Sequence, residues 1–406
     1  MHDLKNNLSL IRNEFPILKK CVYLISNSLG AVPQKVQPGL EQYYKLWAEE
    51  GVSAWRNKWW DLSKKISHQL EELLQAQTSS ITMLPSATIS HWVALSTQFT
   101  DRNSKRNKII MTDLDFPSSI YAVSKIARFM GWKLQLVKSK NSFSLDTEKI
   151  TEKIDDKTLF VATSHVCFKS SLIQDIQSIA EKAAEVGAMT LIDGYHAPGI
   201  IPVDLKNSQV DFYIGGCLKW LCGGPGNAFL YVRPGLAEKI EPSLTGWLAH
   251  ENPFKFDLEL KYTSGPYRFM SGTPPIPCLY TASDGLRIIE QTGIDNIREK
   301  SLSMTETIID QSKQRGFSIC SPLKKDIRGG AVSVNLPEAF KIKQALDHKR
   351  ILVDFRKGSN KKEDVIRIGP HFYNQKEEIN HLFEEIDSLY SSGEYKKYTD
   401  KIKHVT

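Results

Sequence analysis

The stretch LIDGYHAPGIIPVDL (residues 191–205) ends an apolar run on a carboxylate, Asp193, and places His196 three positions later. The run AMTLID (188–193) has the length and composition of a buried strand. An ionised carboxylate at the end of such a strand costs free energy unless it meets a cation or a strong hydrogen-bond donor. Asp193 is therefore either an ordinary turn or helix-capping acid, or part of a binding site.

Short β-type runs alternate with helical runs on both sides of this stretch. Segments 118–131 and 171–188 have helical spacing, and the second ends on Gly187. The expected strands are KIIMT (108–112), KLQLV (133–137), TLFVATSHV (158–166), AMTLID (188–193), DFYIGG (211–216) and AFLYV (228–232). This alternation predicts an α/β fold whose mostly parallel sheet carries helices on both faces and binds ligands at the carboxyl ends of its strands.

From about residue 290 the pattern changes. Longer amphipathic helices are expected over 294–314 and 377–390, around the short β runs AVSVNL (331–336) and DVIRIG (364–369). We expect a smaller C-terminal α+β domain.

Composition excludes several classes of function. The 406 residues are 41% hydrophobic, which is ample for a packed core, and the net charge of +7 is spread among nearly as many acids as bases. Nucleic-acid binding is therefore disfavoured. The six cysteines form no CxxC pair, so we expect no zinc site or disulfide framework. The N-terminus lacks the apolar core of a signal peptide and no membrane-length apolar run is present, so we expect a cytoplasmic protein without a membrane partner.

A lysine follows the next expected strand at the same sheet edge. Lys219 lies in CLKWLCGGPGNAFLYV (217–232), between Leu218 and Trp220 and before a glycine cluster. Apolar neighbours lower the pKa of an amine and make it a usable nucleophile. A lone lysine is more often solvated, but its place between two strands favours a functional amine.

An acid and a lysine on neighbouring strand ends suit pyridoxal phosphate. Lys219 would hold the aldehyde as a Schiff base, and Asp193 would keep the pyridine nitrogen protonated so that the ring acts as an electron sink. Ser86 and Thr88 in LPSATISHWVAL (84–95) would open a helix whose positive end faces the phosphate, although both residues also cap ordinary helices. Phe116 in DLDFPSS (113–119) is a candidate to stack on the ring, although a buried core is the commoner place for phenylalanine.

Several motifs occur together in an order that resembles the kynureninase family, within the class V aminotransferase group of fold type I pyridoxal phosphate enzymes. They are YLISNSLGAVP (23–33), AWRNKWWDLSKKI (54–66), FPSS (116–119), DGYHAPGIIPVDL (193–205), KWLCGGPGNAFLYV (219–232), GWLAH (246–250), FMSGTPPI (269–276) and VIRIGPHFYN (365–374). The resemblance covers nearly the whole chain. It implies an N-terminal arm over 1–60 that joins the small domain and a dimer interface, a large cofactor-binding domain over 61–290 and a small domain over 291–406.

The resemblance also assigns roles to single residues. It implies a phosphate loop at Ala87 and Thr88, a stacking ring at Phe116, the pyridine partner at Asp193, a residue near the cofactor hydroxyl and substrate at His196, and the Schiff-base lysine at Lys219. Arg367 would grip the α-carboxylate of an amino-acid substrate in a bidentate fork, and Asn27 and Trp55 would also lie at the substrate. Trp55, Gly272 and Thr273 match residues that the second subunit of a homodimer supplies, so the active sites would be shared.

Two positions depart from the family pattern. Kynureninases typically have a tyrosine just before the Schiff-base lysine, which reaches the phosphate and assists proton transfer, whereas this chain has Leu218. Tyr195 and Tyr213 are the candidates to replace it. The family also has an acid shortly after the stacking phenylalanine, where this chain has Ser119, which we keep among the cofactor-contacting residues.

The resemblance implies a hydrolase of tryptophan catabolism. It would cleave the Cβ–Cγ bond of kynurenine or a related γ-oxo amino acid to give L-alanine and an acid. A class V aminotransferase, β-lyase or desulfurase remains the alternative, and Cys217, Cys222 or Cys320 could serve a desulfurase. A non-catalytic binding module is disfavoured because the lysine, its acid partner and the arginine are all present.

Overall fold

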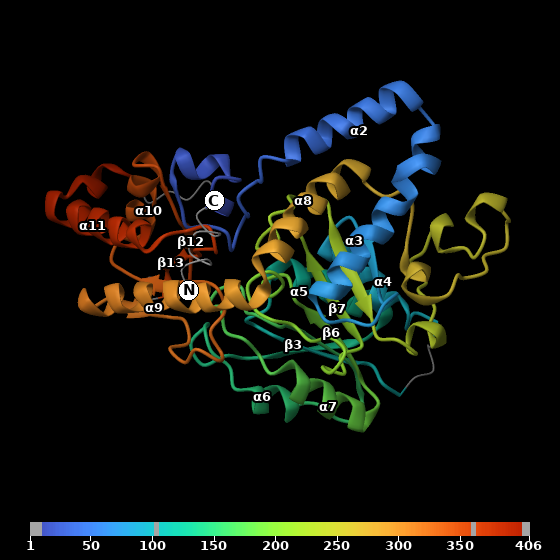
Figure 1. Cartoon of the computed structure of the whole chain (residues 1–406). Helices are drawn as coiled ribbons and strands as arrows, with labels where there is room; N and C mark the ends of the chain where they lie inside the picture. Colours follow the sequence, from blue (N-terminus) through green and yellow to red (C-terminus); the bar gives the residue numbers. More distant parts are fainter. Residues whose placement is uncertain (1–9, 101–104, 359–362, 400–406) are drawn as a thin grey trace.

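A seven-stranded sheet forms the centre of the larger part of the molecule (Figure 1). The structure is a computed structural model that describes residues 10–100, 105–358 and 363–399. The strand order is β2-β8-β7-β6-β5-β3-β4, and β8 runs antiparallel to both neighbours. The strands are β2 (Ile81–Leu84), β3 (Lys108–Thr112), β4 (Lys133–Val137), β5 (Thr158–Ser164), β6 (Met189–Asp193), β7 (Phe212–Gly216) and β8 (Ala228–Val232). The predicted α/β fold with a mostly parallel sheet is confirmed.

Helices cover both faces of this sheet because its inner strands are apolar on both sides. On β6, Leu191 packs toward α4 (Ala87–Ser96) and α5 (Pro117–Met130), while Ile192 packs on the opposite face. That opposite face carries α3 (Trp60–Leu73), α6 (Thr147–Thr151), α7 (Ile176–Val186) and α8 (Ile276–Thr292). The carboxyl ends of β5, β6 and β7 therefore meet at one edge between two layers of helices.

One predicted helix begins later than expected. The helical pattern over 171–188 was expected to be continuous, but α7 begins only after Asp175, whose Oδ1 accepts a hydrogen bond from the Ser178 N–H at 3.0 Å. Before it, Ile173 pairs with Val166 in an isolated β-bridge, and Ser171 has φ of 61°. Tertiary pairing therefore overrides the local helical pattern at this end.

A four-stranded antiparallel sheet of order β12-β13-β10-β9 forms the smaller part. Its core is separate from that of the large sheet. The strands are β9 (Ser318–Ile319), β10 (Val332–Asn335), β12 (Asp354–Arg356) and β13 (Val365–Ile368), and the helices are α9 (Ile294–Gln314), α10 (Ala339–His348) and α11 (Lys376–Ser392). This confirms the smaller C-terminal α+β domain, while the residue bounds 1–60, 61–290 and 291–406 stay a prediction.

The N-terminal segment joins the two parts. Its strand β1 (Val22–Tyr23) pairs with β11 (Ile351–Leu352), and α2 (Val36–Glu50) then runs across to the large sheet (Figure 1). Every described helix is too short or too polar to cross a lipid bilayer.

The loop that carries Lys219 is held from two directions. The Gly30 N–H donates to the Leu218 carbonyl at 3.0 Å, and His371 Nε2 lies 2.8 Å from the Trp220 carbonyl oxygen. A Cβ at Gly30 would lie 2.1 Å from the Lys219 carbonyl oxygen, so only glycine permits this approach. The N-terminal segment and the C-terminal domain together fix the backbone around the lysine.

Replacing Gly30 by alanine is expected to lower the free energy of unfolding by about 1–3 kcal/mol, because the backbone must separate to admit the methyl group. Chemical denaturation measures this. Gly39→Ala in α2 is the matched control, since its Cβ would meet the Tyr280 ring at 4.0 Å, an ordinary contact. Equal stability of the two variants would contradict the close packing of Gly30.

Candidate active site

A cavity of about 230 Å³ lies at the carboxyl ends of β5, β6 and β7. Side chains from several separate segments of the chain form its wall. They are Ala87, Thr88, Phe116, Ser118, Ser119, Ser164, Val166, Phe168, Asp193, Tyr195, His196, Leu218 and Lys219. The structure thus brings together the residues proposed from the sequence for the phosphate loop, the stacking ring, the pyridine partner and the Schiff base.

The side chain of Lys219 lines this cavity. Its Nζ lies 2.6 Å from His196 Nε2. Burial, followed by the nearby Arg367 cation, lowers the pKa of Lys219 to about 7. Burial and the charge of Lys219 hold the pKa of His196 well below its ordinary value, so the imidazole is neutral. Burial and the two nearby arginines, Arg367 and Arg356, therefore keep a large fraction of Lys219 unprotonated near neutral pH.

Asp193 ends β6 with both carboxylate oxygens hydrogen-bonded. Oδ2 accepts from Ser119 Oγ at 2.8 Å, and Oδ1 accepts from the Tyr195 N–H at 3.0 Å. Ser119 therefore supplies a donor to Asp193 where the family pattern has an acid. The two bonds hold a buried carboxylate in one orientation at the cavity wall.

Phe116 is not a core residue. Its side chain is 42% exposed, and its ring centroid lies 5.7 Å from Lys219 Nζ. Asp115 fixes the preceding backbone, since it accepts hydrogen bonds from the Thr112 N–H at 2.7 Å and the Ser164 N–H at 2.6 Å. The sequence analysis missed Asp115, although it stands directly before the proposed stacking ring.

Two helix N-termini face the cavity at another side. Ser86 caps α4 by accepting from the Ile89 N–H at 3.3 Å, and Thr88 lies in the first turn. Thr88 Oγ1 lies 3.1 Å from the hydroxyl of Ser118, which is in the first turn of α5. Paired hydroxyls at two positive helix ends suit a phosphate group. Ser118 was also missed, although it is the first serine of the FPSS motif.

Arg367 lies behind the cavity wall. It is buried on β13, where Nε donates to Asp354 Oδ2 at 2.7 Å, Nη2 also binds Asp354, and Nη1 donates to the Phe168 carbonyl. Burial lowers its pKa to about 10, so it remains a cation. A guanidinium has five N–H donors. These contacts therefore leave two of them for a ligand.

The remaining predicted residues do not line the cavity of the single chain. Asn27 is buried against Gly369, and neither atom of its side-chain amide has a hydrogen-bond partner among the described residues. Trp55 stacks on Trp60, with ring centroids 4.4 Å apart, in a cluster of aromatic side chains. Gly272 and Thr273 are exposed to solvent.

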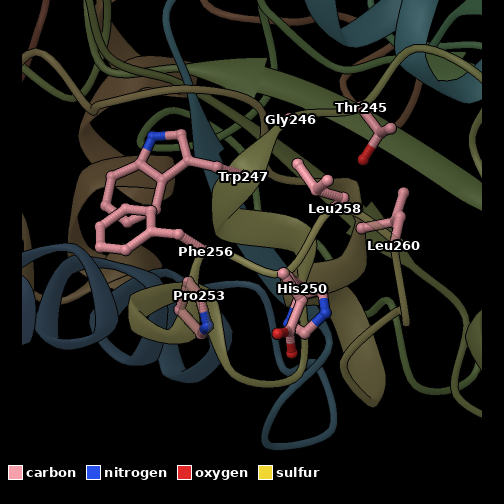
Figure 2. Close-up of a pocket in the computed structure, with 9 residues that line it drawn as sticks. Thr245, Gly246, Trp247, His250, Pro253, Phe256, Leu258 and Leu260 are labelled. Carbon is pink, nitrogen blue, oxygen red and sulfur yellow. The ribbon is translucent and has the colours of Figure 1, made fainter.

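A second cavity of about 350 Å³ lies in segment 245–260 (Figure 2). Its wall is mostly apolar, with the rings of Trp247 and Phe256 stacked 6.0 Å apart. It contains no lysine, so it cannot hold an aldehyde as a Schiff base. The segment protrudes from the large domain on the side away from the small domain (Figure 1).

The first cavity has the groups that pyridoxal 5'-phosphate requires. It offers a partly neutral amine, an oriented carboxylate, an aromatic ring within reach of the amine, and a pair of hydroxyls at helix N-termini. Arg367 pairs with Asp354 and keeps two N–H groups for the carboxylate of a ligand. The residues fit the cofactor.

Known proteins are similar over almost the whole chain. The aminotransferase class-V family matches residues 22–382. A kynureninase of Geobacillus thermodenitrificans is 30% identical and spans 98% of this chain and 95% of its own. A kynureninase of Pseudomonas fluorescens is 29% identical over 87% of this chain and 86% of its own, and an uncharacterized aminotransferase of Bacillus subtilis is 28% identical over 92% and 96%.

Solved structures share the fold. The apo cysteine desulfurase of Thermococcus onnurineus superimposes with a TM-score of 0.81 at 22% identity, over 94% of this chain and 98% of that one. A variant of the protein C-DES with glycine covalently linked to its pyridoxal phosphate cofactor gives 0.83 at 21% identity, over 92% and 98%. Together with the class-V family match, the cofactor-bound neighbour and the fit of the cavity show that the cofactor is pyridoxal 5'-phosphate.

The lowered pKa of Lys219 predicts how the apoprotein captures its cofactor. An amine with a pKa of about 7, rather than 10.5, is mostly neutral above pH 7, so the capture rate should rise with pH around a midpoint near 7. Stopped-flow absorbance of apoprotein mixed with pyridoxal 5'-phosphate measures it, and Lys219→Ala should show no capture. A midpoint near 10 would show that the amine is not perturbed.

Proposed function

Because the chain belongs to the aminotransferase class-V family, we propose that it is a kynureninase-like hydrolase. Its substrate is kynurenine or a related γ-oxo amino acid, and its products are L-alanine and an acid. The observation that carries the proposal is the similarity to kynureninases over up to 98% of the chain, combined with the meeting of the motif residues at one cavity. The reaction would belong to tryptophan catabolism.

Four residues of the cavity have a part in this proposed reaction. Pyridoxal 5'-phosphate supplies, when bound, an electron sink for the negative charge that forms on the substrate. Lys219, neutral beside His196, takes the α-proton of the substrate. Asp193, held by Ser119, would hold the pyridine nitrogen of the bound cofactor protonated. Water then attacks the γ-carbonyl and the Cβ–Cγ bond breaks.

The buried polar groups near β13 suit the amino-acid end of the substrate. Arg367 has two N–H groups left after its bonds to Asp354 and Phe168, which is enough for a bidentate grip on a carboxylate. The Asn27 amide has no partner among the described residues and lies against Gly369, two positions after Arg367. An unpaired buried amide costs free energy until a ligand satisfies it. We assign both residues to the substrate.

An aminotransferase is the second candidate, and Leu218 favours it because the tyrosine expected of a kynureninase is missing. A desulfurase is less well supported. None of the six cysteines lies among the described residues that line the cavity, so a thiol to receive sulfur is not at hand. The similarity to desulfurase structures is a similarity of fold.

We also propose a cytoplasmic homodimer with shared active sites. Trp55, Gly272 and Thr273 lie outside the cavity of their own chain, as residues supplied to a partner's site would. The protruding segment exposes Phe256 by 72% and Leu258 fully. Soluble monomers rarely expose apolar clusters of this kind. A second copy that covers this segment would remove the exposed surface and complete the site.

The hydrolase is tested by adding L-kynurenine and 3-hydroxy-L-kynurenine to the holoenzyme and following release of aryl acid and L-alanine. Equal amounts of both products are expected. Lys219→Ala should lower kcat by at least ~10³-fold, because the base is lost. Lys182→Ala, at an exposed lysine on α7, is the control. Formation of an α-keto acid without aryl acid would instead establish the aminotransferase.

The dimer is tested by light scattering on size-exclusion chromatography. The wild-type mass should be twice the 46.0 kDa of one chain. The double variant Phe256→Asp, Leu258→Asp should be monomeric because charges then replace the apolar contact. Phe129→Asp, at a phenylalanine on α5 that is even more exposed, should remain dimeric. A monomeric wild-type protein, or a dimeric double variant, would refute this interface.

A further inference from the structure

The proposed hydrolysis needs an acid that none of the roles above provides. When the Cβ–Cγ bond breaks, its electron pair remains on the β-carbon, which must gain a proton to become the methyl group of alanine. Lys219 is used at the α-carbon, and Leu218 has no exchangeable proton. Another group in the cavity must therefore act.

We propose that Tyr195 is the catalytic acid that protonates the β-carbon. This inference rests on the proposed function. Tyr195 lines the cavity two positions after Asp193, and Lys219 Nζ lies 4.8 Å from its ring centroid. Its backbone N–H is tied to Asp193, so the residue is anchored, while its hydroxyl makes no hydrogen bond within the described part of the chain. The phenol is therefore free to bind a reacting group.

Close packing fixes where the ring lies. A Cβ at Gly216 would come within 2.5 Å of Tyr195 Cε2 and 2.6 Å of its Oη. The ring thus fills the space left by the missing side chain at the end of β7, next to the loop of Leu218 and Lys219. A phenol from the residues after β6 thus reaches the end of β7 at Gly216, two positions before Leu218 in the chain.

The protonation states of Tyr195 and His196 favour Tyr195 as the donor of the proton to the β-carbon. Burial, with smaller effects of Cys217 and Asp193, raises the pKa of Tyr195, so the phenol enters the reaction protonated. The imidazole of His196 is neutral, and its Nε2 is already engaged with the Lys219 amine at 2.6 Å.

The aliphatic hydroxyls of the cavity already have partners. Ser119 binds Asp193, Ser164 donates to Asp115, and Thr88 pairs with Ser118. Among the hydroxyls that line the cavity, that of Tyr195 alone has no hydrogen-bond partner within the described residues.

Tyr213, the other candidate from the sequence, is excluded by its position. Its hydroxyl lies 2.9 Å from His165 Nδ1, its side chain is fully buried, and it does not line the cavity. A Cβ at Gly194 would lie 2.2 Å from that hydroxyl, which places Tyr213 behind the strand end. It provides a control with the same side chain, buried at a neighbouring strand.

The step balances without a further reactant. The Tyr195 O–H bond breaks and a Cβ–H bond forms, leaving a phenolate. The attacking water gives its hydroxyl to the γ-carbon, and the proton that it releases restores the phenol. Nothing is oxidised or reduced.

The test follows L-alanine in D₂O with the holoenzyme by proton NMR. Exchange at Cβ is the reverse of the proposed protonation, whereas exchange at Cα depends on Lys219. Tyr195→Phe should keep Cα exchange within a few-fold of wild type and slow Cβ exchange by about 10²–10⁴-fold. Tyr213→Phe should keep both rates. The dissociation constant of pyridoxal 5'-phosphate should be unchanged in Tyr195→Phe, because the ring remains.

The outcomes separate the two proposals. Wild-type Cβ exchange in Tyr195→Phe would overturn the assignment of Tyr195 and leave the hydrolase intact. Loss of both exchange rates together with weaker cofactor binding would show that Tyr195 is structural, and would also overturn it. A wild-type protein that exchanges Cα but never Cβ would refute the hydrolase, and the role of Tyr195 with it.

Discussion

The buried amine of Lys219 is the constraint on which the rest of the structure depends. A charged lysine surrounded by protein is costly, and burial therefore lowers the pKa of the amine to about 7, where it lies beside the neutral imidazole of His196. The amine is useful only if it stays in place. Gly30 and His371 bind the carbonyls on either side of Lys219, so parts of the chain far apart in sequence hold one loop.

The charged groups near this amine also help to keep it neutral. Asp354 lies between Arg367 and Arg356, each paired with one of its carboxylate oxygens. One acid against two arginines leaves a net positive charge near the cavity, and that charge contributes to the lowered pKa of Lys219. The same excess attracts the carboxylate of an amino acid. One arrangement therefore prepares the nucleophile and the substrate site together.

The sequence was sufficient for features that depend on local pattern. The alternation of strands and helices predicted the sheet. Because parallel strands end at one edge of a sheet, the sequence also predicted that Asp193 and Lys219 lie close together. Strand β2 was not predicted, because its four residues, Ile81–Leu84, are too few to distinguish a strand from other apolar runs. The predicted start of α7 was wrong because a β-bridge between Leu172 and the distant Arg328, beside the one between Val166 and Ile173, overrides local spacing.

The direction of side chains could not be predicted in this way. Tyr195 and Tyr213 are equally plausible in the sequence, and only contacts across strands distinguish them: Gly216 admits the first ring beside the cavity, and Gly194 admits the second behind it. The sequence showed only that Ser119 replaces an acid of the family pattern. The structure shows that its hydroxyl donates a hydrogen bond to Asp193. Such roles depend on distances between segments that no local pattern records.

The substitution at Leu218 need not disable the cavity, because parallel strands bring the ends of β6 and β7 to one edge. A hydroxyl absent after β7 can be supplied after β6 without any change in the backbone. The condition is steric: the end of β7 must leave room for the ring, and glycine at position 216 does so, since any side chain there would overlap Tyr195. The glycine therefore decides whether the tyrosine can reach the cavity. The chemistry of such an edge is a property of the neighbouring strand ends together, rather than of any single position in a motif.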